Sequence, residues 1–399
     1  MLNALWDSLY LASRYLRHHV AKTLILVISI AIIVFLPIGL EVLVSRSGEA
    51  LMTRARSTPL LLGARGSALE LVLGALYFES DPPPPTRHAE VDRVTRSGFA
   101  EAIPLHVRFR ARGRPIVGTT LEYFELRGLR VAAGRRMAVL GECVLGAEAA
   151  RTLGLAPGDT VVSSPESAFD LAGVYPTELT VVGVLAFANG PDDRAIFVDV
   201  KTAWVIEGLG HGHQDLTRIE AQSVVMAREA NRITANASVA QYNRVTPENA
   251  ASFHFHGDLA RYPLTAVIAV PPDARARALL MGRFAGADEH SQILRPEQAM
   301  AELLETVFTV RSYVVAGIAI VGLTTVSTAA LVFFLSFRLR RSEIETMAKI
   351  GGARSRIAAL LVMEVALVLG IGLAVAGVLT ILIERYGEAM IRALVVLES

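Results

Sequence analysis

Residues 313–337 read YVVAGIAIVGLTTVSTAALVFFLSF, a run of 25 positions without a charged side chain. Two further apolar blocks are of similar length: TLILVISIAIIVFLPIGLEVLVS at 23–45 and IAALLVMEVALVLGIGLAVAGVLTILI at 357–383. About 20 apolar residues are enough for a helix to cross a bilayer. The chain has 399 residues, of which 52% are hydrophobic and 19% charged, and we predict a membrane protein with three transmembrane helices. The first block could instead be a signal peptide, but no small-x-small cleavage site follows it.

Basic residues predict the orientation of these spans. Residues 1–22 carry three basic side chains against one acidic, and residues 338–356 carry six basic against two acidic. Because short loops rich in Arg and Lys stay in the cytoplasm, we expect both segments to be cytoplasmic. This arrangement places residues 46–312 and the tail 384–399 on the outer side of the membrane.

The outer segment is large enough to fold around its own core. Residues 46–312 hold 28 basic and 30 acidic side chains, so this region is nearly neutral. Strand-like runs (179–187, 194–200, 265–270) alternate with helix-like runs (201–208, 273–284), which predicts an α+β extracytoplasmic domain over 46–295. The net charge of the whole chain is +1, which excludes the broad basic field typical of nucleic-acid binding.

Two helices are predicted next to the spans. Residues 2–16 space their leucines as an amphipathic helix, which would lie at the inner membrane interface. Residues 296–337 begin with Pro296 and Glu297, typical of a helix start, and no Gly or Pro interrupts them before Gly317. We therefore expect a stalk helix that is continuous with the second span and able to carry motion, or to serve as a simple tether.

The loop 338–356 contains a short helix with one apolar face. Ser342 and Glu345 match an S-x-x-E capping box, and Gly351 and Gly352 are expected to end the helix. The apolar face combines Ile344, Met347, Ala348 and Gly351. On the cytoplasmic side such a helix needs a surface, which could be lipid headgroups or a groove on a soluble partner.

The loop also carries a family motif. The run RRSEIETMAKIGGARSRI (340–357), followed by a span that contains MEVAL, resembles the motif of FtsX-like ABC permeases of the MacB type, related to lipoprotein-releasing permeases. The matching positions are Arg340, Arg341, Glu343, Ile344, Ile350, Gly351, Ile357 and Glu364. Two positions depart from it, since Ala348 stands at the usual basic position, with Lys349 next to it, and Gly352 replaces the usual Ala. A second, outer match comprises 144–161 and 179–185.

The resemblance implies a permease subunit of a bacterial plasma (inner) membrane that works with a separate cytosolic ABC ATPase. Two permeases would form a homodimer, and ATP hydrolysis would move the outer domain (mechanotransmission) to export or extract a substrate, with a periplasmic adaptor or substrate-binding protein as a possible partner. The ATPase would contact Glu343, Ile344, Glu345, Met347, Lys349, Gly351 and Gly352. ATP and Mg²⁺ would bind the ATPase, and no cofactor is expected in this chain, because its sequence has no P-loop motif.

The resemblance leaves other readings open. Family members usually have four spans, so this chain is either a three-span variant or lacks a C-terminal segment. The family also includes regulators of extracytoplasmic cell-wall enzymes, and this alternative predicts no substrate-stimulated ATPase activity. Nothing in the motifs supports an enzyme active site in the chain itself: no nucleophile elbow is present, and Cys143 lies in a strand-like stretch as a core residue.

Glu364 is an acidic residue within the third span. Such a residue is costly in a membrane, and we favour a structural or coupling role over proton transport, with Arg356 or solvent within its reach.

Nine histidines include two H-x-H pairs, His211 with His213 and His254 with His256. Residues i and i+2 of a strand share a face and could bind one metal ion, with His290 as a further ligand. Because spacing fixes no third ligand, we expect no metal site and keep a metal-handling or metal-sensing outer domain as the alternative.

Overall fold

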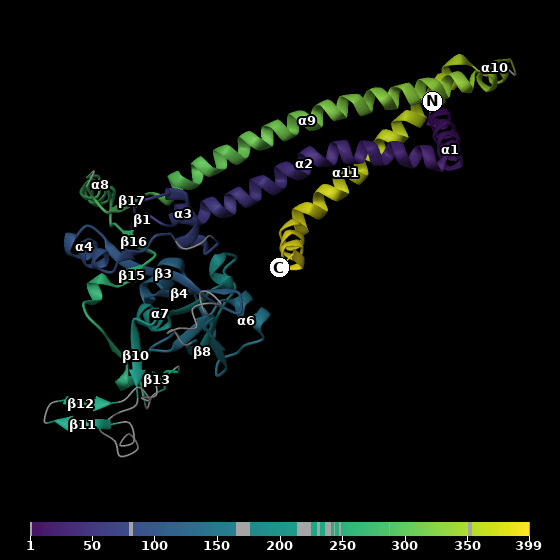
Figure 1. The fold of residues 1–399 in the computed structure, drawn as a ribbon. Coiled ribbons are helices and arrows are strands. Elements are labelled where there is room, and N and C mark those ends of the chain that lie inside the picture. Colours follow the sequence, from purple (N-terminus) through teal and green to yellow (C-terminus); the bar gives the residue numbers. More distant parts are fainter. Residues whose placement is uncertain are drawn as a thin grey trace. The chain divides into compact units, whose positions relative to one another are not determined.

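The computed structural model describes residues 2–79, 83–164, 176–213, 225–229, 232–235, 241–242, 244–246, 249–286, 288–349 and 353–398. The chain forms two compact units (Figure 1). Met1–Glu49 and Leu304–Ser399 make up unit 1, and Ala50–Leu303 make up unit 2.

Unit 1 is helical. Its helices are α1 (Leu2–His18), α2 (Val20–Arg56), α9 (Pro296–Leu339), α10 (Arg341–Lys349) and α11 (Arg354–Glu398), and the ends of α2 and α9 extend into unit 2. Among the described residues, α2, α9 and α11 are long and apolar enough to cross a membrane. Within unit 1, α1 packs against α11, with Ala12 buried and Trp6 exposed.

Ion pairs join the long helices of unit 1 near one end. Glu41 of α2 pairs with Arg311 of α9 at 2.6 Å, and Arg46 of α2 pairs with Glu384 of α11 at 2.7 Å. Residues 384–398, expected as a separate tail, instead continue α11, because no proline interrupts them. The charged residues of this segment are thus carried on the same helix as the third apolar block.

The hydroxyl groups in α9 bond within their own helix. Thr324, Thr325, Ser327 and Thr328 each donate a hydrogen bond to a carbonyl three or four residues earlier. Backbone carbonyls therefore satisfy these polar groups without a partner chain.

Unit 2 is built on a mixed sheet. Within the described residues, ten strands join in the order β17-β1-β16-β3-β4-β9-β6-β8-β5, with β7 paired to β8. Their bounds are β1 Leu60–Ala64, β3 Glu101–Ala111, β4 Arg114–Thr119, β5 Val131–Gly134, β6 Glu142–Leu145, β7 Thr160–Val162, β8 Glu178–Leu185, β9 Ile196–Asp199, β16 Ala266–Val270 and β17 Ser291–Leu294. The pairs β4/β9 and β6/β8 are parallel, and the other pairs are antiparallel.

Short helices and minor strands surround this sheet. The helices are α3 Ala68–Val72, the π-helix η1 Leu73–Tyr77, α4 Ala89–Ser97, α5 Leu121–Arg127, α6 Ala147–Leu153, the 3-10 helix η2 Pro191–Arg194, α7 Val200–Ile206, η4 Ala250–Ser252, η5 Leu259–Arg261 and α8 Ala274–Arg283. The minor strands are β2 Thr86–Arg87, β10 Gly210–His213, β11 Val225–Glu229, β12 Arg232–Ala235, β13 Gln241–Tyr242, β14 His254–Phe255 and β15 Pro263–Leu264.

The strands follow the hydrophobic pattern of the sequence. In β8, alternate residues are buried, among them Leu179, Val181 and Leu185, as expected for a strand with one face on the core. The predicted strands at 194–200 and 265–270 correspond to β9 and β16, and the predicted helices at 201–208 and 273–284 correspond to α7 and α8. These predictions are confirmed, and the outer unit is α+β.

Cys143 lies in the centre of β6 and is fully buried. Burial raises the pKa of its thiol to about 12, so the reactive thiolate is scarce at neutral pH. The prediction that Cys143 is a core residue is confirmed.

Gly146, which precedes α6, brings the chain very close to η2. A Cβ atom added at this glycine would lie 2.2 Å from the carbonyl oxygen of Asp192 and 2.4 Å from that of Asp193. The Gly146 amide also donates to the Ala195 carbonyl at 2.8 Å. The position of η2 therefore depends on a residue without a side chain at 146.

We predict that Gly146→Ala destabilises unit 2 by about 1–3 kcal/mol, because the new methyl group must displace backbone atoms of η2. Gly190→Ala is the matched control, since a Cβ there meets nothing within 4 Å and its φ of −148° suits any residue. Heat-induced unfolding of the full chain in mild detergent, followed by the fluorescence of buried Trp204, measures the difference. Equal unfolding temperatures for the two variants would contradict the prediction.

Candidate functional site

The predicted coupling helix is α10, and it follows α9 after a single residue. Arg340 alone separates Leu339 from Arg341. On α10, Glu345 and Lys349 are exposed, whereas Ile344 and Met347 are half-buried. The side chain of Glu343, together with Ile350, Gly351 and Gly352, lies outside the described residues.

The capping box predicted at Ser342 is wrong. The helix already includes Arg341, and the Ile344 amide donates to the Arg340 carbonyl at 3.0 Å. Ser342 is therefore inside the first turn and not at the N-cap. The Glu345 carboxylate accepts a hydrogen bond from Arg341 Nε at 3.1 Å, an i,i+4 pair on the helix surface.

The residue between α9 and α10 makes a buried ion pair. Arg340 Nη1 lies 3.0 and 3.2 Å from the two carboxylate oxygens of Glu364 in α11. Only 13% of the Arg340 side chain and 6% of the Glu364 side chain are exposed. The Arg340 guanidinium also stacks over the ring of Tyr15 in α1, 3.8 Å from the ring centroid.

This contact changes the expected partner of Glu364, because Arg356, the proposed partner, is exposed. A charge held by a guanidinium in this way favours a positioning role for Glu364. The start of α10 is thereby fixed to α11 and to α1, since Arg340 contacts both.

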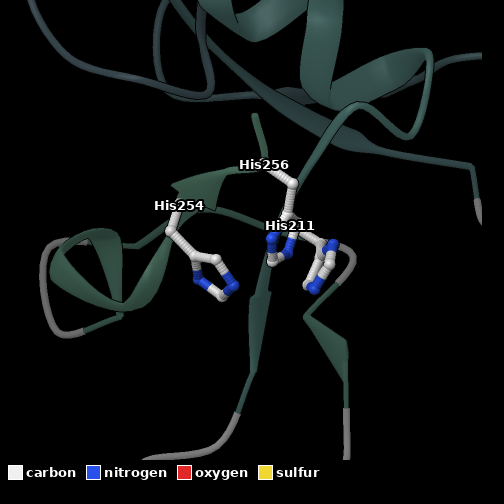
Figure 2. A group of neighbouring side chains, drawn as sticks. All are labelled: His211, His254 and His256. Carbon is white, nitrogen blue, oxygen red and sulfur yellow. The ribbon is translucent and has the colours of Figure 1, made fainter. Parts of the chain in front are cut away.

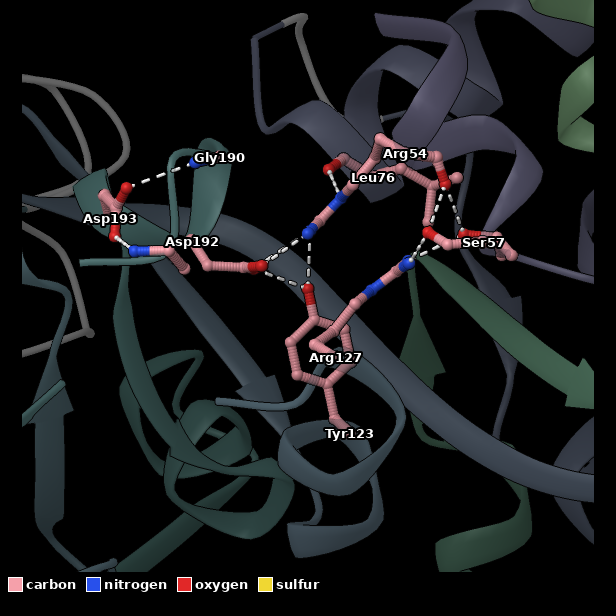
Figure 3. Close-up of polar contacts among 10 residues, drawn as sticks. Arg54, Ser57, Leu76, Tyr123, Arg127, Gly190, Asp192 and Asp193 are labelled. Carbon is pink, nitrogen blue, oxygen red and sulfur yellow. Dashed lines mark hydrogen bonds and ion pairs between the residues drawn. The ribbon is translucent and has the colours of Figure 1, made fainter. Parts of the chain in front are cut away.

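A second buried ion pair lies in unit 2, where the last turns of α2 end (Figure 3). Arg54 Nη1 pairs with one carboxylate oxygen of Asp192 in η2, and Arg54 Nη2 donates to the other at 2.9 Å. The Tyr123 hydroxyl of α5 accepts from Arg54 Nη2 at 2.7 Å and donates to Asp192 at 2.7 Å. Arg54 Nε donates to the carbonyl of Leu76 in η1 at 3.0 Å. All three polar side chains thus have several partners.

Neighbouring bonds tie the same end of α2 to the domain. Arg127 donates to Ser57 Oγ at 2.8 Å and to Thr58 Oγ1 at 2.7 Å, and the Tyr77 hydroxyl donates to the Leu51 carbonyl. Residues from η1, α5 and η2 therefore hold one helix end. We call Arg54, Tyr123, Arg127 and Asp192 the α2 anchor.

Electrostatics agree with this geometry. Burial acts to raise the pKa of Asp192, but the charge and hydrogen bonds of Arg54 outweigh it and hold the pKa below the ordinary value of 3.8. Burial raises the pKa of Tyr123 to about 12, so this phenol stays protonated and can donate to the carboxylate. Asp192 is therefore an anion at neutral pH.

The histidines form a group that differs from the predicted pairs. His211, His254 and His256 offer nitrogen atoms that all lie within 4.8 Å of one another (Figure 2). The side chain of His213 lies outside the described residues, and His290 is exposed and is not a member of the group.

Comparison with known proteins identifies the family of this chain. The family model for the MacB-like periplasmic core domain matches residues 23–242, more than half of the chain. The chain belongs to this family. It is a permease component of a MacB-like ABC transporter, and it is a membrane protein with an extracytoplasmic domain. The family implies a partner ATPase.

Two solved structures are similar to part of this MacB-like chain. The periplasmic region of MacB from Actinobacillus actinomycetemcomitans shares 11% identity with a TM-score of 0.35, covering 63% of this chain and 97% of that chain. The extracellular domain of the noncanonic ABC-type transporter YknZ from Gram-positive bacteria shares 12% identity with a TM-score of 0.32, covering 59% and 99% respectively. Comparison with curated proteins finds no match.

Sequence reasoning missed the α2 anchor of this MacB-like permease. Arg54 follows the first apolar block like any basic flanking residue, and Asp192 lies in a Gly-Pro-Asp-Asp run (190–193) that is typical of a turn. Their burial arises from tertiary contacts between α2, α5 and η2, which no local spacing encodes. The Gly-Pro-Asp-Asp run at 190–193 was the one local signal, since it brings two acidic residues into a tight turn.

We predict that Asp192→Asn destabilises unit 2 by about 3–5 kcal/mol, because it leaves the Arg54 guanidinium buried without a counter-charge. Glu79→Gln is the control, since it removes an exposed partner of Arg194 and is expected to cost at most about 1 kcal/mol. The double variant Arg54→Met with Asp192→Leu should be less destabilised than Asp192→Asn alone. Trp204 fluorescence in a urea titration measures the free energy of unfolding of each of the three variants relative to the parent.

The Asp192→Asn variant also tests how the stability of unit 2 depends on pH. Because the folded-state pKa of Asp192 is depressed, its contribution to stability is complete above the ordinary pKa of 3.8 and is lost as pH falls through the lower folded-state value. The stability gap between the parent and Asp192→Asn should therefore narrow on acidification below about pH 4. A gap that stays constant from pH 7 to pH 3 would show that Asp192 does not carry this charge.

Proposed function

We propose that this chain is the permease subunit that couples ATP hydrolysis by a separate cytosolic ATPase to movement of the extracytoplasmic domain. The observation that carries the proposal is the α2 anchor. Helix α2 is apolar over the first predicted span and continues to Arg56, and its last turns are held inside unit 2 by Arg54, Asp192 and Tyr123. A displacement of α2 along its axis would exert a force on the buried ion pair. Through that pair, the force would reach η2 and α5.

The proposed input is α10. The basic flanks favour a cytoplasmic position for this helix and for the N-terminus. Ile344 and Met347 supply an apolar contact for the ATPase, and Glu345 and Lys349 supply charged contacts at its rim. ATP and Mg²⁺ would bind the ATPase, since the sequence of this chain has no P-loop.

The proposed output is work at the outer face of the membrane. Helix α9 runs without a break from Pro296 to Leu339, so it gives a second continuous path beside α2. Two copies of the permease would act as a pair, and an adaptor or substrate-binding protein would contact the outer domain. Substrate would be exported or extracted by movement of that domain.

We predict that Met347→Glu abolishes association with the ATPase, because it places a charge on the apolar contact of α10. Leu279→Glu on α8 is the matched control, since it adds the same charge at an exposed apolar residue of the outer unit. The tagged full chain is purified from its native host in mild detergent, and co-purifying proteins are identified by mass spectrometry.

An ATPase that accompanies the parent and Leu279→Glu, but not Met347→Glu, supports the proposal. An ATPase that accompanies Met347→Glu as well would contradict the role of α10. Failure to recover any ATPase with the parent, even after crosslinking, would contradict the proposed coupling.

A further inference from the structure

The register of two minor strands brings three histidines onto one face. Strand β10 pairs with β14 in the antiparallel direction, and His211 lies directly opposite His254. Directly opposed residues point to the same side of a sheet, and so do residues two apart in an extended chain, which adds His256, the residue that follows β14. The ring centroids are 4.7–4.9 Å apart (Figure 2).

The residues next to these histidines pack on the opposite face. A Cβ at Gly210 would lie 2.5 Å from the Phe255 ring, and a Cβ at Gly212 would lie 2.5 Å from the Phe253 ring. The glycines therefore let two aromatic rings lie directly on the backbone of β10. Phe255 in turn packs edge-on against Trp204, within the buried cluster of the domain. The strands that carry the histidines are thus held from behind.

A hydrogen bond orients the ring of one of these histidines, and two more hold the backbone beside the group. His254 Nδ1 lies 2.9 Å from the carbonyl oxygen of Ser252. Because a carbonyl only accepts, Nδ1 carries the proton and Nε2 carries the lone pair that binds a metal. The Tyr262 hydroxyl lies 3.0 Å from the Leu209 carbonyl oxygen and 2.9 Å from that of His256, so it braces the backbone beside two of the histidines.

The ligand set selects a class of cation. Three imidazoles without a thiolate or carboxylate suit borderline divalent ions such as Zn²⁺, and do not suit Ca²⁺ or Mg²⁺, which prefer oxygen ligands. Zn–N bonds are about 2.0–2.1 Å long, so nitrogen atoms within 4.8 Å of one another need only side-chain rotation to close around one ion. Three protein ligands leave a fourth position for water or an outer ligand.

We propose that His211, His254 and His256 bind one Zn²⁺ ion in the extracytoplasmic domain. His211 and His254 come from separate strands that are far apart in the sequence, so the ion fastens β10 to β14. Binding therefore stabilises this part of unit 2 by linking folding to metal occupancy. The site is independent of the ATPase coupling proposed above.

The test uses the full chain in mild detergent, purified with a tag that contains no histidine and freed of metal with a chelator. Titration calorimetry with ZnCl₂ is expected to give one equivalent per chain. Absorption spectra with Co²⁺ are expected to show the bands of a four-coordinate ion. Zn²⁺ is also expected to raise the unfolding temperature reported by Trp204.

Variants separate the site from other surface histidines. His211→Gln and His256→Gln should each weaken Zn²⁺ binding at least about 10-fold and remove the Co²⁺ bands. His256 is exposed, so its replacement carries little risk for folding, and unchanged Trp204 fluorescence checks this point. His290→Gln, which alters an exposed histidine outside the group, should leave binding unchanged.

Two results would overturn the proposal. In one, the parent binds no more Zn²⁺ than the triple variant His211→Gln, His254→Gln, His256→Gln. In the other, His290→Gln weakens binding as much as His256→Gln does. Neither result depends on whether an ATPase associates with the chain, so the metal site and the coupling function stand or fall separately.

Discussion

The buried ion pair between Arg54 and Asp192 is the constraint on which the outer domain depends. A guanidinium and a carboxylate that leave water lose several kcal/mol of solvation each, and only a nearly complete set of hydrogen bonds offsets this loss. Here Arg54 has partners on Asp192, on Tyr123 and on the Leu76 carbonyl. All of these hydrogen bonds form together in only one arrangement of α2, η1, α5 and η2. The ion pair therefore fixes the position of the end of α2 more than it adds to the stability of the domain.

The outer match to the family, residues 144–161, helps to hold η2 in the position from which Asp192 reaches Arg54. Gly146 stands between β6 and α6, and it admits the backbone of η2 so closely that no side chain fits. Asp193, next to the anchor, accepts from the amides of Ala188 and Gly190 and so holds the turn that presents Asp192. Gly146 and the turn at η2 look like ordinary loop residues in the sequence. Together they position the buried carboxylate of Asp192 so that it pairs with Arg54.

The spacing of apolar residues predicted the helices and strands that bury one face. The apolar blocks, the strand at 179–187 and the helix at 273–284 follow from spacing, because burial of one face sets the pattern. The α2 anchor and the partner of Glu364 could not be predicted, because each joins residues that tertiary packing alone brings together. The histidine group lies between these cases: the i,i+2 rule placed His254 beside His256, but strand register supplied His211.

In unit 1, a buried ion pair likewise fixes the connection between α9 and α10. Arg340 is the single residue between the two helices, and its side chain pairs with Glu364 of α11 while it stacks on Tyr15 of α1. A flexible loop would absorb a force applied to α10, whereas a one-residue connection held by a buried ion pair passes that force to α9 through the backbone and to α11 through the side chain. Under the proposed function, the two buried Arg–carboxylate pairs have equivalent tasks: Arg340 fixes the helix that receives the ATPase, and Arg54 fixes the helix end that moves the outer domain.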